Sequence, residues 1–212
     1  MERIVNILLI DDHVLFREGM ELVLQRIYPE VRVGHASNVD AGVRRLLQEP
    51  PDLVLTDLNF PGVQGIEALV RVRTANDAVP AVVLAGSEEP AVVRSAIDLG
   101  AMGYIPKSSD SGEVSRALRL TLRGGVYLPP VALATDRTRA AQGPALTPRQ
   151  REVLLKLIQG KPNKVIAREL EISDATVKTH VAALLQALEV DNRTQAVYAV
   201  ARLGVALGEA AP

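Results

Sequence analysis

The sequence contains no cysteine among its 212 residues. Disulfides, thiolate-bound metals and cysteine nucleophiles are therefore excluded. No apolar run reaches the length of about 18 residues that a membrane-spanning helix needs. No signal-peptide pattern precedes Asp11, so we expect a cytoplasmic protein without membrane association. A glycine-rich phosphate loop ending in Lys-Ser/Thr is also missing, which argues against nucleotide hydrolysis.

The composition suits one large domain or two small ones, and an apolar fraction of 48% is enough for a folded core. Charge is divided unevenly along the chain. Residues 1–144 carry 15 basic and 18 acidic residues, a net charge of −3, whereas residues 145–212 carry 9 and 7, a net charge of +2. A slightly basic C-terminal part could contact an anionic partner. A randomly solvated surface explains this difference equally well.

The N-terminal part alternates between two kinds of apolar pattern. Short β-branched and aliphatic runs bounded by turn residues predict five strands, at residues 4–10, 31–36, 53–56, 81–84 and 103–105. Helical spacing follows each of them, at residues 16–27, 40–48, 65–73, 91–99 and 111–122. Strict alternation of this kind predicts a doubly wound α/β domain with a parallel sheet.

Acidic residues follow two of these strands. Asp11 and Asp12 come after the first, and Asp57 comes after the third. Parallel strands finish at one edge of the sheet, where open α/β folds bind their ligands. Three carboxylates at one place would repel one another without a cation. A hard divalent ion with oxygen ligands, most naturally Mg²⁺, fits such a cluster.

This cluster makes the sheet edge a candidate site for phosphoryl chemistry. A carboxylate beside Mg²⁺ can act as a nucleophile and form an aspartyl phosphate, which is the role we assign to Asp57. Lys107 follows the fifth strand and would reach the same edge, where its ammonium can neutralise phosphoryl charge. A single aspartate after a strand is usually a turn or cap residue. His13 reads as a neighbour of the acid pair, and His35 as a strand-end residue without a role.

The C-terminal part follows a break rich in proline and glycine, which predicts a linker over residues 127–144. Beyond it, capping and breaker residues predict four short helices. The first runs from Thr147 to about residue 158, and the others cover 163–170, 174–188 and 194–203. The second and third helices form a helix-turn-helix. The chain is thus predicted to have an N-terminal domain at 1–126 and an all-α four-helix domain at 145–208.

Three segments of the N-terminal domain resemble the receiver domain of bacterial response regulators: 10–13 (Ile-Asp-Asp-His), 57–62 (Asp-Leu-Asn-Phe-Pro-Gly) and 103–107 (Gly-Tyr-Ile-Pro-Lys). The resemblance implies a five-stranded sheet in the flavodoxin-like order 2-1-3-4-5. It also implies that Asp57 accepts a phosphoryl group from a sensor histidine kinase. Asp12, Asp57 and the main-chain carbonyl of Asn59 would bind Mg²⁺ directly, and Asp11 would help through water. Lys107 would pair with the phosphoryl group, and Tyr104 matches the aromatic whose rotamer reports activation.

The sequence departs from this family at the end of the fourth strand. Relatives place a Thr or Ser there, whose hydroxyl binds a phosphoryl oxygen, but this chain has Ala85. Alanine has no donor. Ser87, two residues on, substitutes only if the loop shifts. The departure puts the coupling between phosphorylation and the switch in question.

The C-terminal domain resembles the LuxR-type DNA-binding domain in four segments, at 146–154, 163–167, 176–181 and 192–196. Together with the receiver, this order of domains resembles the NarL/FixJ class of response regulators. The resemblance implies that double-stranded DNA is bound by residues of the helix-turn-helix and of the last helix. Three would face bases (Lys178, Thr179 and Ala182), and four would meet phosphates (Asn163, Lys164, Arg193 and Thr194). For His180, a packed or capping role and a phosphate contact are equally open.

The reading helix is poor in cations, because positions 182, 183 and 187 are all alanine where relatives carry polar or basic residues. Fewer neutralised phosphates mean a shallower salt dependence of DNA binding. DNA affinity is then either low or reliant on dimerisation, and we expect a homodimer on activation. Apolar residues of the last helix (Val197, Val200 and Leu203) offer surface for it.

We interpret the chain as a transcriptional regulator controlled by phosphorylation of Asp57, and not as an enzyme beyond self-phosphorylation from a donor and autodephosphorylation. Three alternatives stay open. Ala85 favours a regulator that ignores phosphate and is governed by dimerisation or a protein partner. An aspartyl-phosphate hydrolase would need an Asp-x-Asp motif, but Asn59 replaces its second acid. The three alanines favour an interaction module with a vestigial DNA-binding domain.

Overall fold

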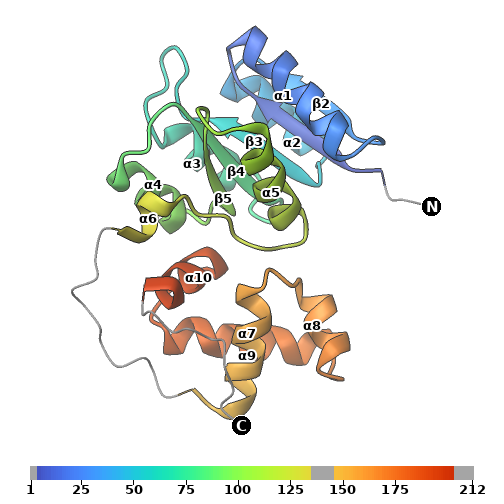
Figure 1. The fold of residues 1–212 in the computed structure, drawn as a ribbon, viewed down its shortest axis with the longest axis vertical. Helices are drawn as coiled ribbons and strands as arrows, with labels where there is room; N and C mark the ends of the chain where they lie inside the picture. Colours follow the sequence, from blue (N-terminus) through green and yellow to red (C-terminus); the bar gives the residue numbers. More distant parts are fainter. Residues whose placement is uncertain (1–3, 135–145, 203–212) are drawn as a thin grey trace.

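The computed structural model describes residues 4–134 and 146–202 and shows two bodies, an α/β unit and a smaller helical unit (Figure 1). The α/β unit is built on a parallel sheet of β1 (Asn6–Ile10), β2 (Arg32–Ala36), β3 (Leu53–Asp57), β4 (Ala81–Ala85) and β5 (Gly103–Pro106). The strand order is β2-β1-β3-β4-β5. This confirms the predicted doubly wound fold.

Five helices connect or follow these strands: α1 (Val14–Ile27), α2 (Val39–Gln48), α3 (Glu67–Ala75), α4 (Pro90–Asp98) and α5 (Ser111–Leu122). Their apolar sides cover both faces of the sheet. Helices α2, α3 and α4 pack on one face, where Leu46, Leu69 and Val93 are buried. Helices α1 and α5 pack on the other, through Leu24 and Leu118. All five residues of β3 and of β4 are buried, as near-continuous apolar runs in a parallel sheet require.

The helical unit consists of α7 (Pro148–Ile158), α8 (Asn163–Glu169), α9 (Asp174–Ala187) and α10 (Arg193–Arg202). Helix α7 begins with a complete capping box, in which Thr147 and Gln150 satisfy each other's main-chain amides. Ser173 caps α9 through the amide of Thr176. The predicted buried stripe of α9 is present, because Val177 and Leu184 are inaccessible and their neighbours on the stripe pack against the same core.

The structure differs from the sequence prediction in the linker. Residues Pro130–Ala134, which fall within the predicted linker at 127–144, form a short helix, α6. Ala132 of this helix is buried in the sheet's core, on the side of α4. The predicted end of the last helix at Leu203 lies outside the described residues. Within the described ranges, no helix is both long and apolar enough to cross a membrane.

The two units touch through α10, which contacts α4 and α6 (Figure 1). Asn192, just before α10, donates from Nδ2 to the main-chain carbonyl of Asp98 at 3.1 Å, and Gln195 donates from Nε2 to the same carbonyl at 3.3 Å. This carbonyl lies at the C-terminus of α4, where helices have unsatisfied acceptors. The helical unit therefore completes hydrogen bonds that α4 cannot make within itself.

Candidate functional site

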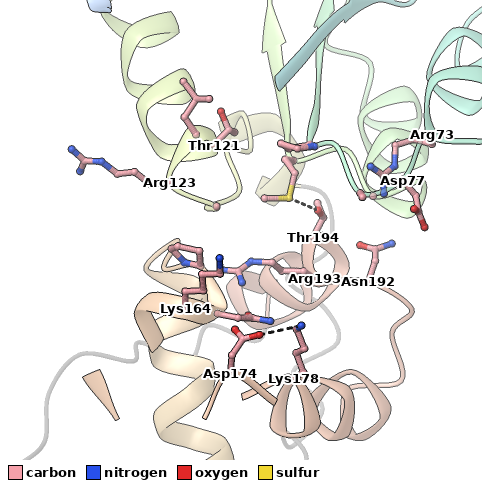
Figure 2. A pocket seen from close by; sticks show the side chains of 18 residues that line it. Arg73, Asp77, Thr121, Arg123, Lys164, Asp174, Lys178, Asn192, Arg193 and Thr194 are labelled. Atoms are coloured by element: carbon pink, nitrogen blue, oxygen red, sulfur yellow. Dashed lines mark hydrogen bonds and ion pairs between the residues drawn. The ribbon is translucent and has the colours of Figure 1, made fainter. Parts of the chain in front are cut away.

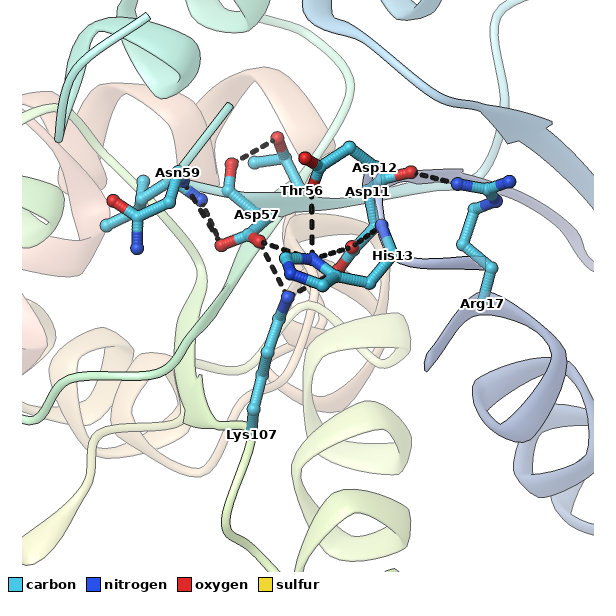
Figure 3. Close-up of polar contacts among 9 residues, drawn as sticks. Asp11, Asp12, His13, Arg17, Thr56, Asp57, Asn59 and Lys107 are labelled. Carbon is cyan, nitrogen blue, oxygen red and sulfur yellow. Dashed lines mark hydrogen bonds and ion pairs between the residues drawn. The ribbon is translucent and has the colours of Figure 1, made fainter. Parts of the chain in front are cut away.

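The C-terminal edge of the sheet gathers the acidic residues and the lysine that the sequence predicts there (Figure 3). Asp57 is the last residue of β3, Asp11 follows β1, and Lys107 follows β5. The Lys107 Nζ atom lies 2.6 Å from Asp57 Oδ2 and 2.7 Å from Asp11 Oδ2. Both carboxylates are almost inaccessible, with exposed fractions of 1% and 0%. The strand ends thus place a single ammonium between two buried carboxylates.

Lys107 is held in its charged form. Burial lowers the pKa of its ammonium, but hydrogen bonds to Asp11 and Asp57 outweigh that effect and raise the pKa above its ordinary value. The Nζ atom also lies 4.5 Å from the centre of the Phe16 ring, a cation–π contact from helix α1. The sequence places Phe16 at the start of the predicted helix at 16–27 and gives no sign of this contact. Its ring adds a further favourable interaction to the ammonium.

The Asp57 carboxylate has two differently held oxygens. Oδ1 accepts hydrogen bonds from the main-chain amides of Leu58, at 2.6 Å, and Asn59, at 3.2 Å. Oδ2 faces Lys107. The turn after β3 therefore orients the carboxylate, and its second oxygen is directed toward the cation and the neighbouring acids.

The acid cluster fits a hard divalent cation. Ligand atoms of Asp11, Asp12, His13 and Asp57 lie within 4.8 Å of one another. Asp11 Oδ2 and Asp12 Oδ1 are buried; the first lies 2.7 Å from Lys107 Nζ, and the second lies 2.9 Å from His13 Nδ1. Carboxylate oxygens of this kind are the ligands that Mg²⁺ takes in proteins. The main-chain carbonyl of Asp11 is occupied instead by the guanidinium of Arg17, a contact that the sequence did not predict.

The predicted switch residues lie in β4 and β5 or just after β4, near the same C-terminal edge of the sheet. Ala85 ends β4 next to β3, is buried, and accepts a hydrogen bond from the Lys107 amide at 2.7 Å. Tyr104 is buried in β5, and its hydroxyl donates to the main-chain carbonyl of Ser87 at 2.5 Å. Burial, together with Glu88, Asp57 and Glu89, raises the pKa of Tyr104 to about 12. The Ser87 hydroxyl itself is exposed and accepts from the Glu89 amide, at 3.1 Å.

The residues predicted to contact DNA fall into two groups. Lys178, Thr179 and Ala182 are exposed on α9, as a reading helix requires. Lys178 makes an ion pair of 3.0 Å with Asp174, one turn before it. The phosphate-contact candidates lie at the starts of α8 and α10, and several of them face the α/β unit (Figure 2).

A cleft of about 590 Å³ separates the two units there, lined by residues of both, including Arg73, Arg123, Lys164, Lys178 and Arg193 (Figure 2). Thr194 has an exposed fraction of 1%, and its hydroxyl contacts the Met102 sulfur at 3.8 Å. The Arg193 guanidinium donates to the carbonyls of Leu157 and Lys161, and burial lowers its pKa to about 10. In this arrangement, Arg193 and Thr194 are engaged within the protein.

The fold and the phosphoryl-type site together define a two-part signalling protein, and the comparisons with known proteins identify its class. Residues 7–119 match the response regulator receiver domain, and residues 144–200 match the bacterial regulatory proteins of the luxR family. The chain is 36% identical to the glycerol metabolism activator of Pseudomonas putida over 205 residues, covering 91% of this chain and 93% of that one. It is 36% identical to the nitrate/nitrite response regulator NarL of Escherichia coli K12, covering 90% and 92%.

The chain therefore belongs to the response regulators that join a receiver domain to a LuxR-type DNA-binding domain. Its relatives are transcription regulators. Among solved structures, the RcsB response regulator of Salmonella typhimurium matches with a TM-score of 0.57 at 24% identity, covering 91% of this chain and 96% of that chain. That likeness supports the fold.

Proposed function

We propose that Asp57 accepts a phosphoryl group from a sensor histidine kinase, and that this modification controls binding of double-stranded DNA by α8, α9 and α10. The observation that carries the proposal is the Asp57 carboxylate, which is buried, oriented by two amides and paired with Lys107. A carboxylate nucleophile needs a fixed direction and a nearby positive charge to accept the charged phosphoryl group.

The protein's own residues have separate tasks in this transfer. The Leu58 and Asn59 amides hold Oδ1, so that Oδ2 is the oxygen presented for attack on phosphorus. The Lys107 ammonium, kept protonated by its raised pKa, is close enough to pair with an oxygen of the arriving phosphoryl group. Asp11, Asp12, Asp57 and the Asn59 carbonyl would hold Mg²⁺, which when bound neutralises phosphoryl oxygens.

The arrangement of the two domains supports control of DNA binding by the receiver. Thr194 is buried and its hydroxyl contacts Met102 of the receiver, and Lys164 and Lys178 line the cleft between the domains. DNA cannot reach Thr194 unless the domains separate. We therefore propose that phosphorylation favours an open form, in which a homodimer reads two half-sites roughly one helical turn apart.

The missing hydroxyl at Ala85 sets the strength of this control. A modification shifts a conformational equilibrium only by its differential interaction with the two states. Without a donor at position 85, the phosphoryl group has one partner fewer in the active state. We infer a smaller shift than a Thr or Ser at this position gives. We retain as proposals a receiver at 1–126, a linker at 127–144 that includes helix α6, a DNA-binding domain at 145–208 and a cytoplasmic location.

Phosphate-affinity electrophoresis after incubation with acetyl phosphate and Mg²⁺ tests the phosphoacceptor. The wild type should form one retarded band whose phosphate is labile to acid and to base, as an acyl phosphate is, and Asp57→Asn should form none. Asp40→Asn is a matched control, because Asp40 is an exposed aspartate that pairs with Arg71 away from the site. Retained labelling of Asp57→Asn, or labelling that is unaffected by EDTA, would contradict the assignment.

A further inference from the structure

His13 lies over the acid cluster, at the start of helix α1 (Figure 3). Its ring Nδ1 atom is 2.9 Å from Asp12 Oδ1, 3.1 Å from Asp11 Oδ1 and 3.9 Å from Asp57 Oδ2. The imidazole therefore directs one nitrogen at all three carboxylates. This position is set by the main chain, because the His13 amide donates to Asp11 Oδ1 at 2.8 Å.

Helix capping does not account for the direction of the ring. His13 is the N-cap residue of α1, but its side chain makes no capping hydrogen bond to the helix. The side chain is 64% exposed, so packing does not force the ring into the cluster either. Among the described residues, the Nδ1 atom of His13 contacts only carboxylate oxygens.

Two carboxylate oxygens of the cluster are buried beside basic nitrogens. Asp11 Oδ2 lies 2.7 Å from Lys107 Nζ, and Asp12 Oδ1 lies 2.9 Å from His13 Nδ1. One nitrogen and three carboxylates, with ligand atoms within 4.8 Å of one another, form a mixed nitrogen–oxygen ligand set. Mg²⁺ prefers oxygen ligands, whereas imidazole favours later first-row metals such as Co²⁺, Ni²⁺ and Zn²⁺.

We propose that His13 is an additional protein ligand of the receiver's metal site, and that it gives the site a preference for imidazole-binding divalent cations over Mg²⁺. This inference rests on the proposed metal site, and it concerns the choice of metal rather than the phosphoacceptor. Under the proposal, the same carboxylates hold either ion, and the imidazole contributes only to the softer one. The metal that loads the receiver then depends on His13.

Calorimetric titration of the untagged, metal-free chain with CoCl₂ and with MgCl₂ tests the proposal. The variant His13→Ala should bind Co²⁺ about tenfold more weakly than the wild type, or weaker still, because it lacks a direct ligand. Mutation of residues that only support a ligand already costs about 10–100-fold in metal affinity. Mg²⁺ binding should stay within about twofold of the wild type, because oxygen ligands hold that ion. The visible absorption of bound Co²⁺ should also change in the variant.

His35→Ala is the matched control, because His35 lies on β2 outside the cluster and pairs with Glu21 of helix α1. It should leave both affinities unchanged. Unaltered Co²⁺ binding by His13→Ala would overturn the proposal, and so would equal losses for Co²⁺ and Mg²⁺. In either case, Mg²⁺-dependent labelling of Asp57 would keep the proposed function intact. A wild type that binds neither ion would overturn the metal site itself.

Discussion

Replacement of Lys107 by methionine tests how much this lysine stabilises the metal-free receiver by neutralising its buried carboxylates. Methionine keeps much of the apolar stem and removes the charge. The lysine Nζ lies 2.6 and 2.7 Å from two carboxylates with exposed fractions of 1% and 0%. In the variant, Asp11 and Asp57 are left as buried like charges without their shared cation.

The magnitude follows from the burial of this cluster. Removing one partner of a buried ion pair costs about 3–5 kcal/mol, because an uncompensated charge remains. The lysine side chain is 17% exposed, so water moderates the loss, and we expect about 3 kcal/mol. A divalent cation neutralises the same carboxylates and no longer competes with the ammonium. Mg²⁺ should therefore stabilise Lys107→Met more than it stabilises the wild type.

Urea denaturation followed by circular dichroism, with and without saturating MgCl₂, measures both effects. Lys161→Met is a suitable control, because it removes a lysine that pairs with Glu169 at the surface. The control should unfold at nearly the wild-type urea concentration, with an unchanged response to Mg²⁺. A loss of stability in Lys107→Met no larger than in the control, or no extra stabilisation of the variant by Mg²⁺, would refute this prediction.

Three further predictions concern the switch and the DNA. Ala85→Thr should strengthen phosphorylation-dependent dimerisation tenfold to hundredfold, as a charge-assisted hydrogen bond of about 1.5–3 kcal/mol implies; equal dimerisation constants in analytical ultracentrifugation would refute it. In Gly125→Ala, the added Cβ would lie 2.9 Å from the Gly160 Cα across the domain boundary and 2.4 Å from Leu120. Because overpacking costs about 1–3 kcal/mol, the unphosphorylated variant should bind operator DNA several-fold more tightly in gel-shift titrations, and unchanged affinity would count against the closed form. Lys178→Ala should lose about 1–3 kcal/mol on a selected operator and less on scrambled DNA; equal weakening, with the salt slope reduced by about one, would make Lys178 a phosphate contact.

The sheet could be predicted because its strands are short apolar runs between turn residues. Three strands run one residue further than expected, to Asp57, Ala85 and Pro106. A polar, small or proline residue at a strand end keeps its place in a parallel ladder, but no strongly apolar side chain marks it. The sequence did not predict helix α6, because a segment of five residues is too short to show helical periodicity. The pair Pro129 and Pro130 is also typical of a break between elements.

The acidic edge of the site could also be predicted, since parallel strands bring their ends together. Asp11, Asp12, Asp57 and Lys107 lie where the sequence indicated. The roles of Phe16 and Arg17 could not be predicted, because both residues lie on a helix whose rotation over the sheet is fixed only by packing. The individual contacts of Asn192 and Gln195 depend on how the two domains meet, which no local pattern encodes.

The hydrogen bonds from the DNA-binding domain to the end of α4 have a consequence in the opposite direction. Coupling between two binding events is reciprocal, so whatever the phosphoryl group contributes to DNA affinity, DNA contributes equally to the stability of the phosphorylated receiver. An operator that holds Asn192 and Gln195 away from Asp98 removes the same contacts that the proposed opening on phosphorylation would remove. Operator DNA is then an effector of the receiver, and promoter-bound copies would be phosphorylated at lower donor levels than free ones.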